Sequence, residues 1–196
     1  MIVAPVTLEG SRVRLEPLSM DHFPALAEIA FEPSLWQWMN DRIENEADLR
    51  RFVQSALDLS AAGTAMVWVT RSKIDGNIAG STRFGDIHTT HRSLEIGWTW
   101  LHPRYQRSGI NVEAKYLQLR HAFEEMGARR VAFKTHHQNM QSQTAILALG
   151  AKHEGVFRNH VIRYDGSTRH SYWYSIIAEE WPEVKENLER RMQHYF

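Results

Sequence analysis

One carboxylate interrupts an apolar stretch in the middle of the chain. The segment Leu94–Leu101 has the sequence Leu-Glu-Ile-Gly-Trp-Thr-Trp-Leu, and Glu95 is its only charged residue. A glutamate on a strand can act as a general base, or it can be a solvated charge or one half of an ion pair with a nearby arginine. Alternation along the strand predicts two faces, with Glu95, Gly97 and Thr99 on one and Leu94, Ile96, Trp98 and Trp100 on the other.

A basic loop with one glycine follows this stretch. It comprises Gln106, Arg107, Ser108, Gly109, Ile110 and Asn111. A helical pattern begins at Ile110 or Asn111, and the first N–H groups of a helix lack partners while its dipole is positive there. A loop across that end can therefore hold a phosphate, with Gly109 allowing close approach and Arg104 and Arg107 adding positive charge. The alternative is an ordinary surface turn with two solvated arginines.

The helix after the loop has one apolar face. Its inward side chains recur at spacings of three and four residues, at Val112, Tyr116, Leu119, Phe123 and Met126. Gly127 stands where the helix is expected to end, and Arg129–Thr135 follows with the composition of a strand. A helix that crosses between two strands of one sheet predicts that the two strands are parallel.

The other segments alternate between strand and helix patterns. Strands are expected at 12–18, 65–70, 78–84, 94–101, 129–135, 153–163 and 169–177, and helices at 22–30, 44–62, 110–126, 139–150 and from 182 to the end. Asp-Gly turns at 75–76 and 165–166 predict two hairpins. This order predicts an α+β (α/β) fold, with a mixed, mostly antiparallel sheet, a central parallel βαβ pair and flanking helices. With no repeat or linker, one domain over residues 1–196 is expected.

The basic loop is similar to a known family motif. Gln106-x-x-Gly109-x-Asn111 resembles the Gln/Arg-x-x-Gly-x-Gly/Ala loop of the GNAT superfamily of acetyl-CoA-dependent N-acyltransferases. In that family the loop binds the pyrophosphate of coenzyme A, which implies the same role for Gln106 through Asn111. Asn111 departs from the small last residue of the motif, and Asn is also a good helix N-cap. No Gly-Lys-Ser/Thr follows, so the loop does not resemble a nucleoside-triphosphate loop.

Further spaced matches extend the resemblance over nearly the whole chain. They are closest to the Rim-type branch, which acetylates the N-termini of ribosomal proteins. The matching pieces are Leu94-Glu-Ile-Gly-Trp98, His102-Pro-x-Tyr105, Asn139-x-x-Ser142, Leu149-Gly150 and Glu154-Gly155-x-x-Arg158. The resemblance implies acetyl transfer from acetyl-CoA to a primary amine, at a protein or peptide N-terminus or on a small molecule. It also implies direct transfer assisted by a general base.

The resemblance also implies roles for individual residues. Glu95 would take the amine proton through water, and Asn139 would contact the pantetheine arm of coenzyme A while capping the short helix that follows it. Many GNAT enzymes have a tyrosine acid where Ile146 stands, so Ser142 is expected to serve the departing thiolate instead. The alternative for Ser142 is a first-turn residue that bonds the backbone. Polarisation of the thioester carbonyl is expected from a backbone N–H of Gly97, Trp98, Thr99 or Trp100.

The acceptor pocket has no pattern that identifies the amine. We expect it to involve Trp36, Trp38, the loop from Arg83 to His91 and the hairpin at Tyr164. Tryptophans in such a segment are more often core or lid residues than binding groups, which is the alternative for both. A second class of function is a GNAT-fold protein that binds coenzyme A without catalysis, as a sensor or interaction domain.

Composition excludes several classes of function. Lys and Arg number 23, as do Asp and Glu, so no overall charge favours nucleic acid or an anionic membrane. The chain has no Cys, no apolar run of 18 residues and no signal-peptide pattern, which together favour a cytoplasmic location.

Neither the histidines nor the aromatic last strand gives a firm site. The chain has 11 His, but the pairs 88/91 and 136/137 lack helical i,i+4 spacing, so no metal is expected. The aromatic segment Tyr172–Tyr174 can form a homodimer contact or belong to the core.

Overall fold

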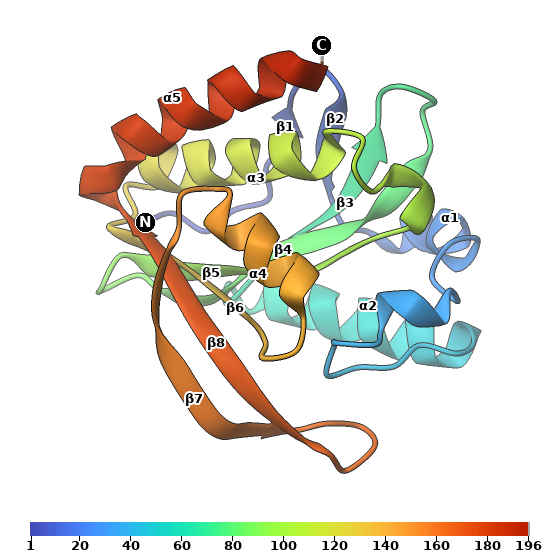
Figure 1. The fold of residues 1–196 in the computed structure, drawn as a ribbon. Helices are drawn as coiled ribbons and strands as arrows, with labels where there is room; N and C mark the ends of the chain where they lie inside the picture. The colour runs from blue at the N-terminus through green and yellow to red at the C-terminus, as the bar shows by residue number, and fades with distance from the viewer. Residues whose placement is uncertain (196) are drawn as a thin grey trace.

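The computed structural model describes residues 1–195 and contains one eight-stranded sheet (Figure 1). The strand order is β1-β2-β3-β4-β5-β6-β8-β7. The strands are β1 (Leu8–Glu9), β2 (Val13–Pro17), β3 (Met66–Ser72), β4 (Ile78–His88), β5 (Ser93–Leu101), β6 (Arg130–His136), β7 (Lys152–Ile162) and β8 (Thr168–Ile177). Neighbouring strands are antiparallel except β5 and β6. The predicted mixed sheet with a central parallel pair is confirmed, and β1 is an added edge strand.

The helices lie on both faces of this sheet. They are α1 (Phe23–Ala27), α2 (Glu46–Ala61), α3 (Ile110–Arg120), α4 (Met140–Leu147) and α5 (Trp181–Met192). α3 and α5 lie side by side over one face, whereas α1 and α2 lie on the other (Figure 1). Burial of apolar side chains against both faces gives two core clusters, which is why β5, between them, is buried on both sides.

The helix predicted after the basic loop is present with its expected limits. α3 begins at Ile110 and is followed by a π-helical turn over His121–Glu125, and Gly127 ends it with φ of 67°. The predicted inward side chains are buried except Phe123, which is half-buried. Tyr116 donates a 2.6 Å hydrogen bond to Glu189, which fixes α3 against α5.

The parallel strands pair over a short length. β5 and β6 are joined only from Ser93 to Glu95 and from Arg130 to Ala132. Beyond these residues the two strands separate, because β6 continues its pairing with β8 while β5 continues its pairing with β4. Backbone groups that face the gap lack a strand partner there.

The loop predicted over residues 83–91 is wrong. β4 continues to His88, so only residues 89–92 separate it from β5. Arg83 is a buried strand residue, covered by the rings of Phe52 at 5.7 Å and Trp98 at 4.2 Å. The charged composition concealed the strand, because side chains from other elements shield the arginine from water.

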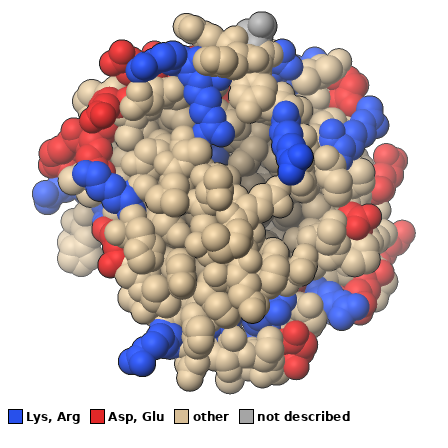
Figure 2. Space-filling model, in the orientation of Figure 1, with Lys and Arg blue, Asp and Glu red and all other residues tan. Residues whose placement is uncertain are grey.

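The outer surface combines both signs of charge. Lys and Arg side chains alternate with Asp and Glu around the rim of the face in Figure 2, and its centre is mainly uncharged. Within residues 1–195, no helix is both long and apolar enough to cross a bilayer.

Candidate active site

Glu95 lies buried on β5 beside a lysine. Its carboxylate Oε2 is 2.7 Å from Nζ of Lys134 on β6, and its side chain is 3% exposed. The register explains the contact, because Ala132 pairs with Glu95 and Lys134 follows two residues later on the same face. Lys134 also lies 3.1 Å from Asp86 on β4. The ion pair considered for Glu95 is therefore present, with a lysine in place of the expected arginine.

This arrangement makes Glu95 a group that titrates near neutral pH. Burial raises the pKa of Glu95 to about 7, although the charge of Lys134 acts in the opposite direction. Contact with Asp86 is part of this increase, while the pKa of Asp86 is lowered by Glu95 and Lys134 against the effect of its own burial. A carboxyl group with such a pKa can accept a proton at physiological pH.

A bulge in β5 changes which side chains share the Glu95 face. Gly97 pairs with Arg83 but Trp100 pairs with Ser81, so β5 has one extra residue at this point. Trp98 takes a positive φ of 50° there. Strict alternation is therefore wrong beyond Gly97.

The contacts of the next residues show the reversal. The ring of Trp98 stacks with Arg83 on the Glu95 side, and Trp100 packs on Trp36 in the α2 core at 5.5 Å between ring centroids. Thr99 instead points to α3, where its hydroxyl accepts a hydrogen bond of 2.7 Å from Lys115. The side chains of Trp98 and Trp100 thus lie on the Glu95 face of β5, where Thr99 was predicted. Thr99 lies on the opposite face, which packs against α3.

Lys115 is a buried residue that the sequence reasoning missed. Its Nζ donates to Thr82, Thr99 and Gln118 at 2.9, 2.7 and 2.9 Å, and burial lowers its pKa to about 7. The signal was present, since position 115 lies three residues after Val112 on the buried stripe of α3. A lysine on that stripe has to be buried with its polar end satisfied.

The basic loop covers the N-terminus of α3. Gly109 occupies the N-cap position with φ of 86°, and Arg107 also has a positive φ of 60°. Gln106 donates to Leu101 O at 3.1 Å, and Ser108 donates to Tyr105 O at 2.6 Å. The side chains of Gln106 and Arg107 remain exposed.

Two further features of the loop were not predicted. Asn111 is the second residue of α3 and does not cap it, because the left-handed conformation at Gly109 starts the helix two residues earlier. The Tyr195 ring packs on Gly109, so that a Cβ added to this glycine would lie 2.8 Å from it. Only glycine fits both the conformation and the space.

The start of α4 lies beside this loop. Asn139 caps α4 as expected, because its Oδ1 accepts from the backbone N–H of Ser142 at 3.0 Å. Gln141 donates to Gln106 at 3.4 Å and so connects the helix to the loop. Ser142 is half-buried in the first turn, and Ile146, at the position of the missing tyrosine, is buried.

The residues expected for the acceptor pocket lie in different surroundings. Trp36 is 1% exposed and donates to Ala30 O at 2.7 Å, so it belongs to the core, and its expected place in an acceptor pocket is wrong. Trp38 is half-buried and packs on His136 with 4.8 Å between ring centroids. The sequence could not distinguish these tryptophans, because both lie in a segment without clear periodicity.

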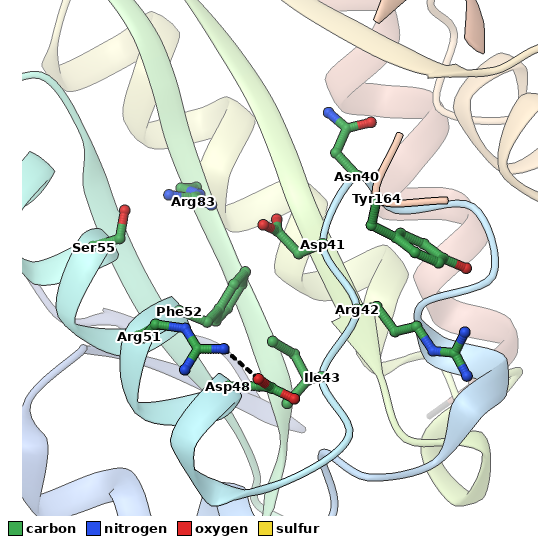
Figure 3. Close-up of a pocket in the computed structure, with 10 residues that line it drawn as sticks. All are labelled: Asn40, Asp41, Arg42, Ile43, Asp48, Arg51, Phe52, Ser55, Arg83 and Tyr164. Carbon is green, nitrogen blue, oxygen red and sulfur yellow. Dashed lines mark hydrogen bonds and ion pairs between the residues drawn. The ribbon is translucent and has the colours of Figure 1, made fainter. Parts of the chain in front are cut away.

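A pocket of about 400 Å³ brings Arg83 and Tyr164 together (Figure 3). It opens between residues 40–43, α2 and the tip of the β7–β8 hairpin, and Asp41 and Phe52 also line it. The hairpin is held to this region because Arg163 donates to Gln37 O at 2.6 Å. The predicted loop at Arg83 was wrong, and Arg83 and Tyr164 line the same pocket.

The histidines do not form a metal site within the described part of the chain. Among residues 1–195, no group of three or more His, Asp or Glu side chains has a geometry that could hold an ion. His136 and His137 stack with 4.4 Å between ring centroids, and the His170 ring is tilted against His137 at 4.7 Å. Burial lowers the pKa of His136 to about 4, with a further contribution from the neighbouring histidines and arginines.

Comparison with known proteins identifies the family. Residues 12–152 match the Acetyltransferase (GNAT) domain family. The chain belongs to the GNAT acetyltransferases. It is 24% identical to the uncharacterized N-acetyltransferase YnaD of Bacillus subtilis (strain 168) over 170 residues, covering 87% of this chain and 96% of YnaD.

Solved structures agree with this membership. A crystal structure from T. thermophilus with a provisional acetyltransferase assignment is 37% identical, with a TM-score of 0.88 and coverage of 97% of this GNAT chain and 99% of the other. Mycobacterium smegmatis RimJ, solved in complex with CoA-disulfide, is 22% identical with a TM-score of 0.83, and 95% of each chain is covered. The similarity to RimJ at this identity shows the fold. The GNAT family consists of acyltransferases that use acetyl-CoA, so this chain is an acyltransferase.

Proposed function

We propose that this GNAT acetyltransferase moves the acetyl group of acetyl-CoA directly to a primary amine, with Glu95 as the general base. The observation that carries the proposal is the position of Glu95 on β5, which leads into the basic loop before α3. Its pKa of about 7 suits removal of a proton from an ammonium group near neutral pH. The acceptor is a protein or peptide N-terminus or a small amine.

The donor is bound between the loop and the separated strands. Gln106 through Asn111 hold the pyrophosphate with the backbone N–H groups that open α3, and Arg107 adds positive charge. Gly109 occupies the N-cap with φ of 86° and has no side chain that could cap the first N–H groups of α3. The pantetheine arm lies in the gap between β5 and β6, near Asn139, and its amides pair with strand groups there.

The transfer then needs one proton removed and one supplied. Glu95 accepts a proton from the acceptor ammonium through water, and the neutral nitrogen attacks the thioester carbonyl carbon. A backbone N–H between Gly97 and Trp100 stabilises the carbonyl oxygen as it gains negative charge. The carbon–sulfur bond breaks as the amide forms, and the second proton of the attacking nitrogen passes through water to the departing thiolate, to which Ser142 donates a hydrogen bond.

Release of thiol tests the reaction, and calorimetry tests the binding site. The protein is mixed with acetyl-CoA and a panel of peptides and small amines, and free coenzyme A is measured over time. We expect release that depends on the amine, and heat of binding when coenzyme A is titrated alone. Absence of amine-dependent release over the whole panel contradicts the transferase proposal, and absence of coenzyme A binding contradicts the assignment of the loop.

A further inference from the structure

Arg83 is a buried cation that lacks an ion-pair partner. The residue is 6% exposed, and no carboxylate of residues 1–195 lies within 4.0 Å of its guanidinium. The rings of Phe52 and Trp98 cover it, and the charges of Asp41, which also lines the pocket, Glu95 and Asp86 act on it only from a distance. A buried guanidinium without a paired anion is costly, so such a residue in a pocket indicates a ligand that supplies the negative charge.

A second buried arginine increases the positive field on the same side. Arg169 on β8 is 7% exposed, and its guanidinium donates to two uncharged groups, Ser171 Oγ at 3.0 Å and Asn40 Oδ1 at 3.1 Å. Asn40 is part of the pocket lining, so Arg169 lies behind the pocket wall. Two other arginines of the pocket, Arg42 and Arg51, are already paired with Glu44 and Asp48.

The pocket lies next to the base. Gly85 pairs with Glu95 and Arg83 pairs with Gly97, so Arg83 and Glu95 are diagonal neighbours on adjacent strands. Their backbones are about 7–8 Å apart in such an arrangement. Figure 3 shows Arg83 on the strand behind Phe52 and across the pocket from Tyr164. A molecule with its amine at Glu95 can therefore place a group a few bonds away against Arg83.

We propose that Arg83 binds a carboxylate of the acceptor, so that the substrates of this enzyme are primary amines with an acidic group close to the amine. This inference rests on the proposed function and specifies its acceptor. The carboxylate can be the α-carboxylate of a free amino acid or an acidic side chain near a peptide N-terminus. A guanidinium and a carboxylate form strong paired hydrogen bonds in a desolvated site, which makes the discrimination against a neutral isostere large.

Matched acceptor pairs test the preference directly. Free L-phenylalanine is compared with its amide for the α-carboxylate, and the dipeptide amides Asp-Ala and Asn-Ala are compared for an acidic side chain. We expect kcat/KM to be roughly 10–100-fold higher for the acid in one pair, and the pair that shows the preference identifies the source of the carboxylate. Equal kcat/KM for acid and amide in both pairs overturns the proposal.

Variants locate the preference at Arg83. Arg83→Gln should raise KM for the acid and abolish discrimination between acid and amide, and Arg83→Lys should retain part of it. Arg50→Gln is the matched control, because this exposed arginine lies on α2 over the Phe23 ring and away from Arg83. Full acid preference in Arg83→Gln, with normal coenzyme A binding as the check on folding, contradicts the role of Arg83.

A binding measurement separates this inference from the proposed function. Glutarate is a dicarboxylate without an amine, so its titration into the protein by calorimetry needs no transfer. We expect it to bind wild type at least 10-fold more tightly than Arg83→Gln. Glutarate binding that depends on Arg83, without transfer to any amine, supports the carboxylate site and contradicts the transferase proposal. Transfer with equal kcat/KM for acids and amides supports the transferase proposal and contradicts the carboxylate site.

Discussion

The two sides of the sheet each bury an ionisable group beside β5, and the surroundings of the two groups differ. On one side, Glu95 contacts Lys134, with Asp86 near, and the Arg83 pocket lies beside it. On the other side, Lys115 is enclosed beneath α3, where its three partners are all uncharged. Burial moves the pKa of each to about 7.

This comparison teaches that a shifted pKa does not identify a catalytic group by itself. Glu95 lies on the strand that leads into the basic loop and is a diagonal neighbour of Arg83 in the pocket lining, so we propose that its proton is exchanged with a substrate. The partners of Lys115 are three uncharged side chains, and its hydrogen bond to Thr99 fixes the residue that follows the bulge at Trp98. We therefore assign chemistry to Glu95 and a structural role to Lys115.

Glu95→Gln gives the largest expected effect. The amide keeps the shape of the side chain but cannot accept the proton, so kcat should fall by roughly 10²–10⁴-fold at neutral pH. Affinity for coenzyme A, measured by calorimetry, should be unchanged. The matched control is Glu125→Gln, since Glu125 is exposed in the π-helical turn after α3. Wild-type turnover in Glu95→Gln would remove this residue from the mechanism.

Lys115→Met tests the buried lysine beneath α3 through the pH dependence of the free energy of unfolding. Between the folded pKa of about 7 and the unfolded value of 10.5, the unfolded chain holds a proton on Lys115 that the folded chain lacks. The free energy of unfolding of wild type should therefore rise relative to the variant, by about 2 kcal/mol between pH 7 and 9. Below about pH 6 the difference should be constant. The free energy of unfolding is measured in urea at each pH. A difference between wild type and variant that stays constant from pH 7 to 9 would show that Lys115 is not desolvated.

Ser142→Ala tests the proposed hydrogen bond to the departing thiolate. Loss of the hydroxyl removes one hydrogen bond to the departing sulfur, so kcat should fall by about 10-fold. Thr144→Ala is the control, because Thr144 is exposed on the same short helix. A steady-state rate equal to that of wild type would leave Ser142 only its backbone contact with Asn139.

Asp86→Asn should give the smallest effect, and it tests whether Asp86 influences the pKa of Glu95. The negative charge of Asp86 raises the pKa of Glu95, so its removal should lower that pKa and move the midpoint of activity to lower pH. Asn also tolerates the positive φ of 45° at this position. A midpoint that moves upward would mean that Asp86 does not influence the base as described.

The sequence predicted the fold well because its periodic patterns and turns are strong. The Asp-Gly hairpins and the apolar stripe of α3 fixed most elements, and Gly109 and Gly127 marked the ends of that helix. The alternation pattern failed at the bulge at Trp98, where β5 has one extra residue, although an isolated glycine such as Gly97 often marks a bulge in a strand. The sequence prediction also failed at Arg83, whose burial depends on rings from distant segments.

The site was predictable only in part for the same reason. Glu95 stood out as a charge in an apolar strand, whereas Lys134 and Asp86 are ordinary strand residues until the register brings them together. The pairing of two strands determines which charged side chains meet, and a single sequence does not specify that register. Lys115 was detectable from its position on the stripe of α3.

The pH dependence of kcat/KM with a saturable amine acceptor tests the central claim most directly. For wild type, Glu95 must lose its proton to act as a base, so activity should rise with pH and level off above a midpoint near 7. Glu95→Gln should lack this rise while still binding coenzyme A. The same midpoint in both proteins would contradict the account, because the titrating group would then lie elsewhere.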